Sequence, residues 1–340
     1  MSIMKSLEQA RSRYMILASR GRGLAALLAL IALPMTPTAA FSQAWPTKTV
    51  NIIVPFPPGG NTDTMARMLA QKFTERFGQN FLIENRIGAS GAIGTAAAAR
   101  AAPDGYTLMF GAFQQISVLP FTEKVSYDPK TDLAYISIFG EGPFVLGVNA
   151  SVPAKTLNEF IGYAKGRPGT MAYASGGVFS GAHLVPALFF SKADISLNHV
   201  PYRGGAPAIA DLLGNHVQAY FGNASELIPI AEDSRVRLLA VSSEKRMEQL
   251  PNVPTVNELF PGFVMSAWNG LMAPAKTPGD VLVNLERATI EAARDVQVQK
   301  ILGNLGITTV GSTSKEFVGR IASENDLLQD AIKAAQSSVK

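Results

Sequence analysis

The sequence predicts an α/β protein with two lobes, in which helices cover both faces of the sheets. From residue 45 onward, apolar β-rich runs alternate with amphipathic helical patterns, as in α/β sheets. Glycine-rich turns connect several of these strands to the helix that follows. The chain has 340 residues and 47% hydrophobic content, which is enough for about two domains.

Each element is expected from its periodicity and its end signals. Strands are expected near residues 49–56, 80–84, 106–111, 134–140, 144–149, 171–175, 197–201, 216–221, 236–242 and 267–273. Helices are expected near residues 61–77, 91–101, 156–166, 181–192, 206–214, 279–297 and 314–335. The segment Asn61-Thr62-Asp63 is expected to cap the first long helix, and Pro207 suits the first turn of another.

The pattern also indicates where the chain crosses between the lobes. The strands near 134–140 and 144–149 lie close together, with Gly140 and Gly142-Pro143 between them, and the strand near 267–273 breaks the alternation. A single continuous sheet is the alternative. The expected division is lobe 1 from residues 45–142 and 270–340, and lobe 2 from residues 143–269.

Residues 1–44 resemble a secretory signal peptide. A basic stretch ends at Arg22, and the apolar run that follows, residues 23–33, has 11 residues. A transmembrane helix needs about 20 residues. Ser42-Gln43-Ala44 fits a cleavage site before Trp45, and Thr38-Ala39-Ala40 is a second candidate. The alternatives are an uncleaved membrane anchor and a start at Met4 or Met15.

Charge and cysteine content narrow the class of protein. The net charge of +4 lies in residues 1–44, because the rest of the chain holds 25 basic and 25 acidic residues. A basic nucleic-acid footprint is therefore not expected. The chain has no cysteine, which excludes disulfides and thiolate chemistry. Together with the signal peptide, this composition predicts a protein of the bacterial periplasm.

The turn at residues 56–63 is a candidate anion site. It reads Phe56-Pro57-Pro58-Gly59-Gly60-Asn61-Thr62-Asp63 and links an apolar strand to a helix. Backbone N–H groups at a helix N-terminus can bind an anion, and glycine lets the ligand approach closely. Asp63 is expected to cap the helix or to accept a hydrogen bond from the ligand or a water. An ordinary loop is the alternative.

Two further glycine-rich turns open helices, and a fourth segment follows a strand. The second turn contains Ser175, Gly176, Phe179, Ser180 and His183, the third contains Arg203, Gly204, Gly205 and Ala206, and the fourth contains Gly111, Phe113 and Gln114. Arg203 can bind a carboxylate with two parallel bonds or pair with a surface acid. His183 is either a ligand contact or a structural residue, and Phe113 is either core or a pocket wall.

No catalytic or metal-binding arrangement accompanies these turns. Ser180 does not lie in a G-x-S-x-G elbow, and no glycine turn has the spacing of a dinucleotide site or a P-loop. The three histidines, His183, His199 and His216, lack the spacing of metal ligands. We therefore predict no enzyme activity, no cofactor and no metal. A hydrolase that uses Ser180 and His183 remains the enzymatic alternative.

Seven segments carry a family resemblance. They are VPFPPGGNTDTMAR (54–67), IENRIGASGAIGTAAAARAAPDGYTLMFG (83–111), YDPKTDLAYIS (127–137), YASGGVFSGAHL (173–184), HVPYRGGAPAIADLLGNHVQ (199–218), RLLAVSSEKRMEQLPNVPTVNEL (237–259) and WNGLMAPAKTP (268–278). The chain resembles the Bug family, the extracytoplasmic solute receptors of tripartite tricarboxylate transporters, from Trp45 to about Lys333.

The resemblance implies a type II periplasmic-binding-protein fold, in which two α/β lobes joined by hinge strands close on a ligand. It implies a periplasmic receptor that passes a small carboxylate to membrane permease subunits. We also expect this receptor to be a monomer. The carboxylate is an aliphatic di- or tricarboxylate, an amino acid or an aromatic acid of the phthalate type, which Phe113 and Phe179 favour. A sensor that feeds a two-component signalling system is the alternative.

The predicted ligand-binding residues are Phe56, Pro58, Gly59, Gly60, Asn61, Thr62, Asp63, Gly111, Phe113, Gln114, Ser175, Gly176, Phe179, Ser180, His183, Arg203, Gly204, Gly205, Ala206 and Asn223. The resemblance is imperfect at three places among them. Arg203 stands where lysine is common, Val178-Phe179 adds bulk to its turn, and Phe113-Gln114-Gln115 replaces a more polar stretch.

Overall fold

The structure is a computed structural model that describes residues 45–338. The expected signal peptide, residues 1–44, lies outside the described residues. The described residues form one compact unit, and each helix in this part of the chain is too short or too polar to span a membrane.

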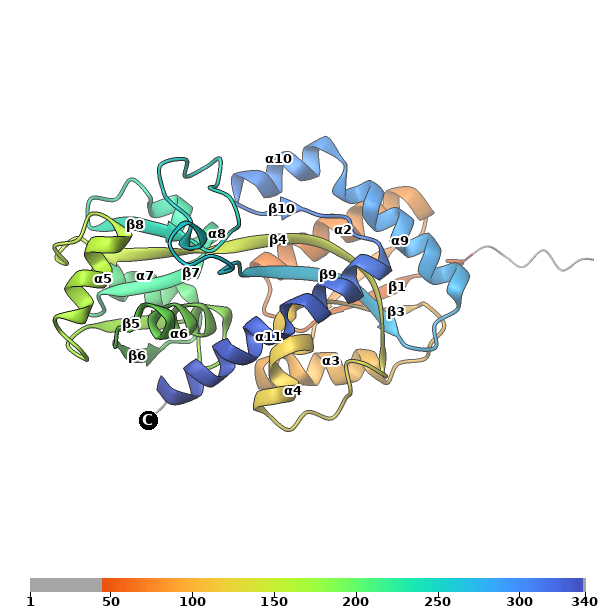
Figure 1. The fold of residues 1–340 in the computed structure, drawn as a ribbon. Coiled ribbons are helices and arrows are strands. Elements are labelled where there is room, and N and C mark those ends of the chain that lie inside the picture. The colour runs from red at the N-terminus through yellow and green to blue at the C-terminus, as the bar shows by residue number, and fades with distance from the viewer. Residues whose placement is uncertain (1–44, 339–340) are drawn as a thin grey trace, which may run out of the picture. The chain divides into compact units, whose positions relative to one another are not determined.

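The elements alternate as the pattern predicts (Figure 1). The strands are β1 (Val50–Val54), β2 (Phe81–Asn85), β3 (Thr107–Ala112), β4 (Leu133–Asn149), β5 (Ala172–Ser175), β6 (Asn198–Pro201), β7 (Ala219–Asn223), β8 (Val236–Val241), β9 (Ser266–Pro274) and β10 (Thr308–Thr309). The helices are α2 (Asn61–Phe77), α3 (Ala92–Ala99), α4 (Leu119–Thr122), α5 (Leu157–Lys165), α6 (Gly181–Ala193), α7 (Gly205–Leu213), α8 (Ala224–Leu227), α9 (Gly279–Ala293), α10 (Val296–Asn304) and α11 (Ser314–Ser338).

The strands follow the order β2-β1-β3-β9-β4-β7-β5-β6, with β8 and β10 also paired to β4. Strand β1 runs parallel to β2 and β3, and β5 runs parallel to β6 and β7. The two parallel groups are connected through antiparallel pairs that involve β4 and β9. Because a helix follows nearly every parallel strand, the loops after β1, β5 and β6 each open a helix.

Strand β4 joins the two halves of the sheet. It is one strand of 17 residues, so the expectation of separate strands near 134–140 and 144–149 is wrong. Its first part pairs with β9 from Leu133 to Pro143, and its last part lies between β7 and β8. Pairing with β9 holds Gly140 and Gly142 in the strand, although glycine does not favour a strand conformation. Strand β10 pairs with Gly140 on the other side. The lobe boundaries proposed from the sequence stay a prediction.

The long helix expected near 279–297 is two helices. Helix α9 ends at Ala293, and Asp295 begins α10, because its side chain accepts hydrogen bonds from the backbone N–H groups of Gln297 and Val298. This is the usual role of an aspartate at a helix start.

One hydrophobic cluster extends through both halves of the sheet. It includes Ile53 and Met109 near β1 and β3, Trp268 and Phe317 where α11 crosses β9, and Phe189 in α6. Helix α11 packs on both β4 and α6, and in Figure 1 it runs obliquely from beside β9 toward α6. A second cluster lies between α2, α9 and the β1 half, and a third lies under α7.

Candidate functional site

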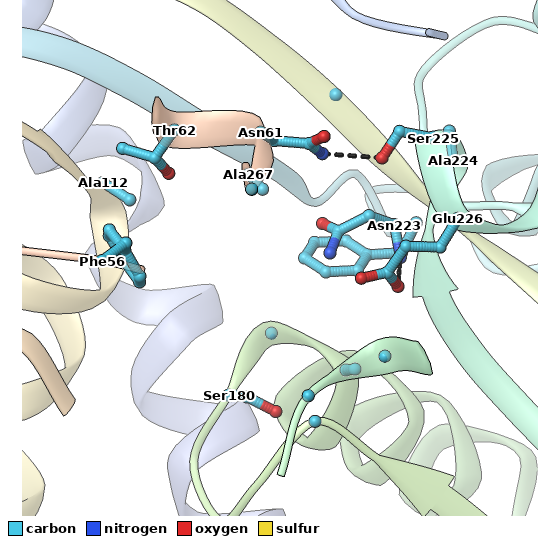
Figure 2. A pocket seen from close by; sticks show the side chains of 18 of the residues that line it. Phe56, Asn61, Thr62, Ala112, Ser180, Asn223, Ala224, Ser225, Glu226 and Ala267 are labelled. Atoms are coloured by element: carbon cyan, nitrogen blue, oxygen red, sulfur yellow. Dashed lines mark hydrogen bonds between the residues drawn. The ribbon is translucent and has the colours of Figure 1, made fainter. Parts of the chain in front are cut away.

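A cavity of about 580 Å³ opens where the loops after β1, β3, β5, β6 and β7 meet (Figure 2). This volume is in the range of sites that bind small molecules. The lining residues are Phe56, Pro57, Gly59, Gly60, Asn61, Thr62, Met65, Ala112, Phe113, Gln114, Gly142, Phe144, Gly176, Ser180, Gly181, Ala182, Gly204, Gly205, Ala206, Ile209, Tyr220, Asn223, Ala224, Ser225, Glu226, Ala267, Asn269, Gly306 and Ile307.

The loop between β1 and α2 presents the start of a 17-residue helix to the cavity. Gly59 has φ of +85°, which glycine adopts without strain. Gly60 precedes the helix in an extended conformation, and no side chain caps it. The expected cap by Asn61, Thr62 or Asp63 is therefore wrong, and the first N–H groups of α2 face the cavity as in helix-based anion sites.

Asp63 holds this turn from behind. Its carboxylate accepts a hydrogen bond from the Gly59 N–H at 2.9 Å and pairs with Arg67 at 2.8 Å and Asn85 at 2.8 Å. Burial raises the pKa of Asp63, but the hydrogen bonds from Arg67, Gly59 and Asn85 outweigh it and place the pKa below its ordinary value. Asp63 is therefore ionised at neutral pH and shapes the loop, although it does not line the cavity.

Two more helices begin at the cavity. Ser180 precedes α6, and its Oγ donates a hydrogen bond to the Gly177 carbonyl at 2.8 Å. Gly204 has φ of +106° and precedes α7. With α2, these helices direct three positive dipole ends to one space, and a helix N-terminus without a carboxylate beside it favours an anion by about 0.3–1 kcal/mol.

Aromatic and apolar side chains form one wall of this space. Phe113 is buried and packs edge-on against Trp268, with ring centroids 6.4 Å apart. Phe144 lies against Gly181, where a Cβ would come within 2.3 Å of the phenyl ring. The glycine at the start of α6 therefore makes room for the aromatic wall.

The charge of the cavity is unusual for an anion site. Among the described residues that line it, none is a lysine, arginine or histidine, and Glu226 has the one formal charge. Helix ends, amides and hydroxyls thus supply the available donors, and these act as neutral groups.

Polar contacts connect the loops around the cavity. The Asn61 side-chain amide donates to Ser225 Oγ at 2.6 Å, as Figure 2 shows, and Thr62 Oγ1 donates to Asn269 Oδ1 at 2.7 Å. Asn61 begins α2, which follows β1, and Ser225 lies in α8, which follows β7 in the other half of the sheet. Their bond therefore ties the β1 half to the β7 half across the cavity.

Two histidines stack behind the second turn. The rings of His183 and His199 are parallel within 3°, with centroids 3.8 Å apart. His183 Nδ1 accepts the Phe179 N–H at 3.0 Å, and His199 Nε2 lies 2.7 Å from Ser175 Oγ. Burial, with the charge of His199, lowers the pKa of His183 to about 3, and burial lowers the pKa of His199 to about 4. Both rings are therefore neutral at pH 7 and support the loop.

The structure brings thirteen of the twenty predicted residues to the cavity wall. Those residues are Phe56, Gly59, Gly60, Asn61, Thr62, Phe113, Gln114, Gly176, Ser180, Gly204, Gly205, Ala206 and Asn223. The other seven do not line it: Pro58, Asp63, Gly111, Ser175, Phe179, His183 and Arg203. Arg203 is exposed to solvent, whereas Ser175 and His183 are buried behind the turn. Contact of the thirteen with a ligand stays a prediction.

Sequence reasoning missed several lining residues. Phe144, Tyr220 and Asn269 come from strand interiors, so only the sheet topology brings them to the cavity. Glu226 did have a signal, because Asn223-x-x-Glu226 has the spacing of a capping box. The structure contains that box at the start of α8.

The comparisons with known proteins agree with this architecture. The family model described as "Tripartite tricarboxylate transporter family receptor" matches residues 65–336. The chain is 37% identical over 289 residues to protein BugT of Bordetella pertussis (strain Tohama I), which covers 83% of this chain and 88% of that protein. It is 34% identical over 311 residues to a UPF0065 protein from the tcbD-tcbE intergenic region of Pseudomonas sp. (strain P51), which covers 90% of this chain and 93% of that protein.

Solved structures with the same fold include two proteins with carboxylates. An R. palustris protein with adipate has a TM-score of 0.76 and 30% identity, and the match covers 86% of this chain and 98% of that chain. MatC from Rhodopseudomonas palustris with bound malate has a TM-score of 0.69 and 28% identity, over 87% of this chain and 100% of that chain. The periplasmic binding protein BugD has a TM-score of 0.74 and 29% identity, over 86% of this chain and 99% of that chain.

The fold is that of a periplasmic solute-binding protein, which confirms the fold class predicted from the sequence. The chain belongs to the tripartite tricarboxylate transporter receptor family. Family and fold are those of solute-binding receptors and not of enzymes. The Ser180 and His183 hydrolase is accordingly excluded. In the structure, Ser180 bonds to Gly177 and His183 bonds to Phe179.

Proposed function

We propose that this receptor captures a small carboxylate in the cavity between the two halves of the sheet and delivers it to the permease of a tripartite tricarboxylate transporter. The observation that carries the proposal is the convergence of three helix N-termini on one cavity of about 580 Å³. A carboxylate accepts hydrogen bonds from such N–H groups without a cationic partner.

The proposed mechanism is capture by closure. The ligand contacts the start of α2 on one side and the starts of α6 and α7 on the other. Because β4 and β9 connect the two sides, they are the proposed hinge strands. A bound ligand stabilises the closed state only through contacts that the open state lacks. The Asn61–Ser225 hydrogen bond is one protein contact that opening would break.

The carboxylate class is supported by the relatives. Adipate is bound in one solved relative and malate in another. We extend that class to this chain, and include an aromatic acid because Phe56, Phe113 and Phe144 line the cavity. Export to the periplasm after removal of residues 1–44, delivery to permease subunits and a monomeric state complete the proposal. A signalling role remains the alternative to transport.

Thermal melting of the purified protein against a panel of acids tests the proposal. The panel contains aliphatic di- and tricarboxylates, amino acids and aromatic acids. A ligand at 100 times its Kd should add about 2.7 kcal/mol of stability, and mass spectrometry should recover it unchanged. A panel without any stabilising acid, for protein stripped of copurified ligand by unfolding and refolding, would contradict the proposal.

A further inference from the structure

Glu226 brings a carboxylate into a cavity that otherwise favours anions. Its Oε2 accepts a hydrogen bond from the Tyr220 hydroxyl at 2.6 Å and another from the Asn223 N–H at 3.1 Å. Among the described residues, no hydrogen bond to Oε1 accompanies these two. Figure 2 shows the Glu226 side chain directed into the cavity beside Asn223. The carboxyl group is thus fixed through one oxygen and has acceptor capacity left on the other.

Two glycines make the space that this carboxylate occupies. A Cβ on Gly205 would lie 2.4 Å from Oε1, and a Cβ on Gly222 would lie 2.9 Å from Oε2. Gly205 is the first residue of α7. Glu226 therefore lies at the N-terminus of α7 and offsets the positive end of that helix dipole.

The cavity consequently has two chemically different ends. At the starts of α2 and α6, the lining residues Gly60, Asn61, Ser180 and Gly181 carry no charge, and the helix ends favour an anion. At the α7 end, the Glu226 carboxylate repels an anion and attracts a cation or a hydrogen-bond donor. A ligand that spans the cavity meets both ends.

We propose that Glu226 determines ligand specificity by selecting a carboxylate that also carries a hydrogen-bond donor, an ammonium group above all, and by disfavouring a second carboxylate at the α7 end. The inference rests on the proposed carboxylate-binding function and narrows its ligand class. A donor from the ligand to Oε1 completes the hydrogen bonding of Glu226. A second carboxylate placed there would lie beside a fixed like charge.

Matched ligand pairs test this proposal by titration calorimetry. Adipate and 5-aminopentanoate have the same four methylenes and differ only at one end, and terephthalate and 4-(aminomethyl)benzoate form the corresponding aromatic pair. In the pair that fits the cavity, we expect the ammonium compound to bind to the wild-type protein at least about tenfold tighter than the dicarboxylate. A charge-assisted hydrogen bond contributes enough binding free energy for a difference of this size. In Glu226→Gln, the ammonium compound should bind at least about tenfold more weakly and the dicarboxylate more tightly.

The Gln variant preserves the shape of the site, because glutamine also serves in a capping box. The matched control is Glu258→Gln, which alters the capping-box glutamate of Thr255 and should leave both affinities unchanged. The proposal would be overturned if Glu226→Gln melts like wild type and has the same ratio of affinities for the ammonium compound and the dicarboxylate. That result would leave carboxylate binding intact. Should the variant not fold, tighter binding of the dicarboxylate to wild type would overturn the proposal. Binding of no member of either pair to either protein would overturn this proposal, and the broader acid panel would then decide the proposed function separately.

Discussion

Gly60 provides a direct test of the α2 end of the cavity. Its φ of −78° and ψ of 170° are accessible to any residue, and a Cβ there would have its nearest neighbour, the Pro57 carbonyl oxygen, at 3.8 Å. A valine at this position is therefore compatible with the fold. Its branched side chain would occupy the space in which a carboxylate approaches the first N–H groups of α2.

The loss of affinity follows from the contact that valine blocks. A hydrogen bond to a charged group contributes about 1.5–3 kcal/mol, so displacement of one such bond should raise Kd by about 10- to 150-fold. The free energy of unfolding without ligand should change by less than about 0.5 kcal/mol, as for an exposed position. Calorimetric titration of Gly60→Val with the acid that stabilises wild type measures the first quantity, and urea unfolding measures the second.

The matched control is Gly162→Val, at a helix position of α5 where a Cβ also has no close neighbour. This variant should bind like wild type. Unchanged affinity in a folded Gly60→Val protein would refute the assignment of the α2 N-terminus to the ligand.

Three further predictions concern stability. Asp63→Asn should lower the free energy of unfolding at pH 7 by about 1–2 kcal/mol through loss of the Arg67 pair. Since the folded pKa of Asp63 is depressed, the stability difference between wild type and variant is present above pH 4, and urea melts should show that it vanishes as the pH falls through the folded pKa. Trp268→Phe removes the donor that lies 3.0 Å from Glu324 Oε2 and should destabilise by about 1–3 kcal/mol; a variant as stable as wild type would contradict this. His183 and His199 have pKa values of about 3 and 4 in the folded state, against about 6.5 in the unfolded state. As the pH falls, the unfolded state therefore binds protons first, and the free energy of unfolding should decrease from pH 6.5 toward pH 4 by up to about 2.7 kcal/mol per pH unit for the two groups. Denaturant melts across this range should show a smaller slope in His199→Gln, and an equal slope would refute neutral burial of His199.

The fold was largely predictable because its helices and strands have strong local signals. Helix α2 has the bounds expected from its pattern, with Gly78 in a left-handed conformation at its end. The errors lie where pairing or capping overrides the local pattern. Gly140 and Pro143 suggest a break in β4, but β9 pairs with both positions and keeps the strand continuous. Asp295 divides a helical pattern that apolar periodicity alone would continue.

The site was predictable only where backbone carries it. In the glycine-rich turns before a helix, the backbone alone places Gly60, Ser180 and Gly205 at the cavity. Side-chain direction decided the failures, because Arg203 points to solvent and His183 turns into the core. Residues of strand interiors, such as Asn269, reach the cavity through sheet order, which no local pattern in the sequence encodes.

The measurement that tests the central claim most directly compares a carboxylate with its primary amide. The acid that stabilises the protein and the amide of the same skeleton are titrated into the purified receptor by calorimetry. If helix N-termini hold the carboxylate, the acid should bind at least about 100-fold tighter, since two charge-assisted hydrogen bonds lose their charge in the amide. Equal affinity for the acid and the amide would contradict the account.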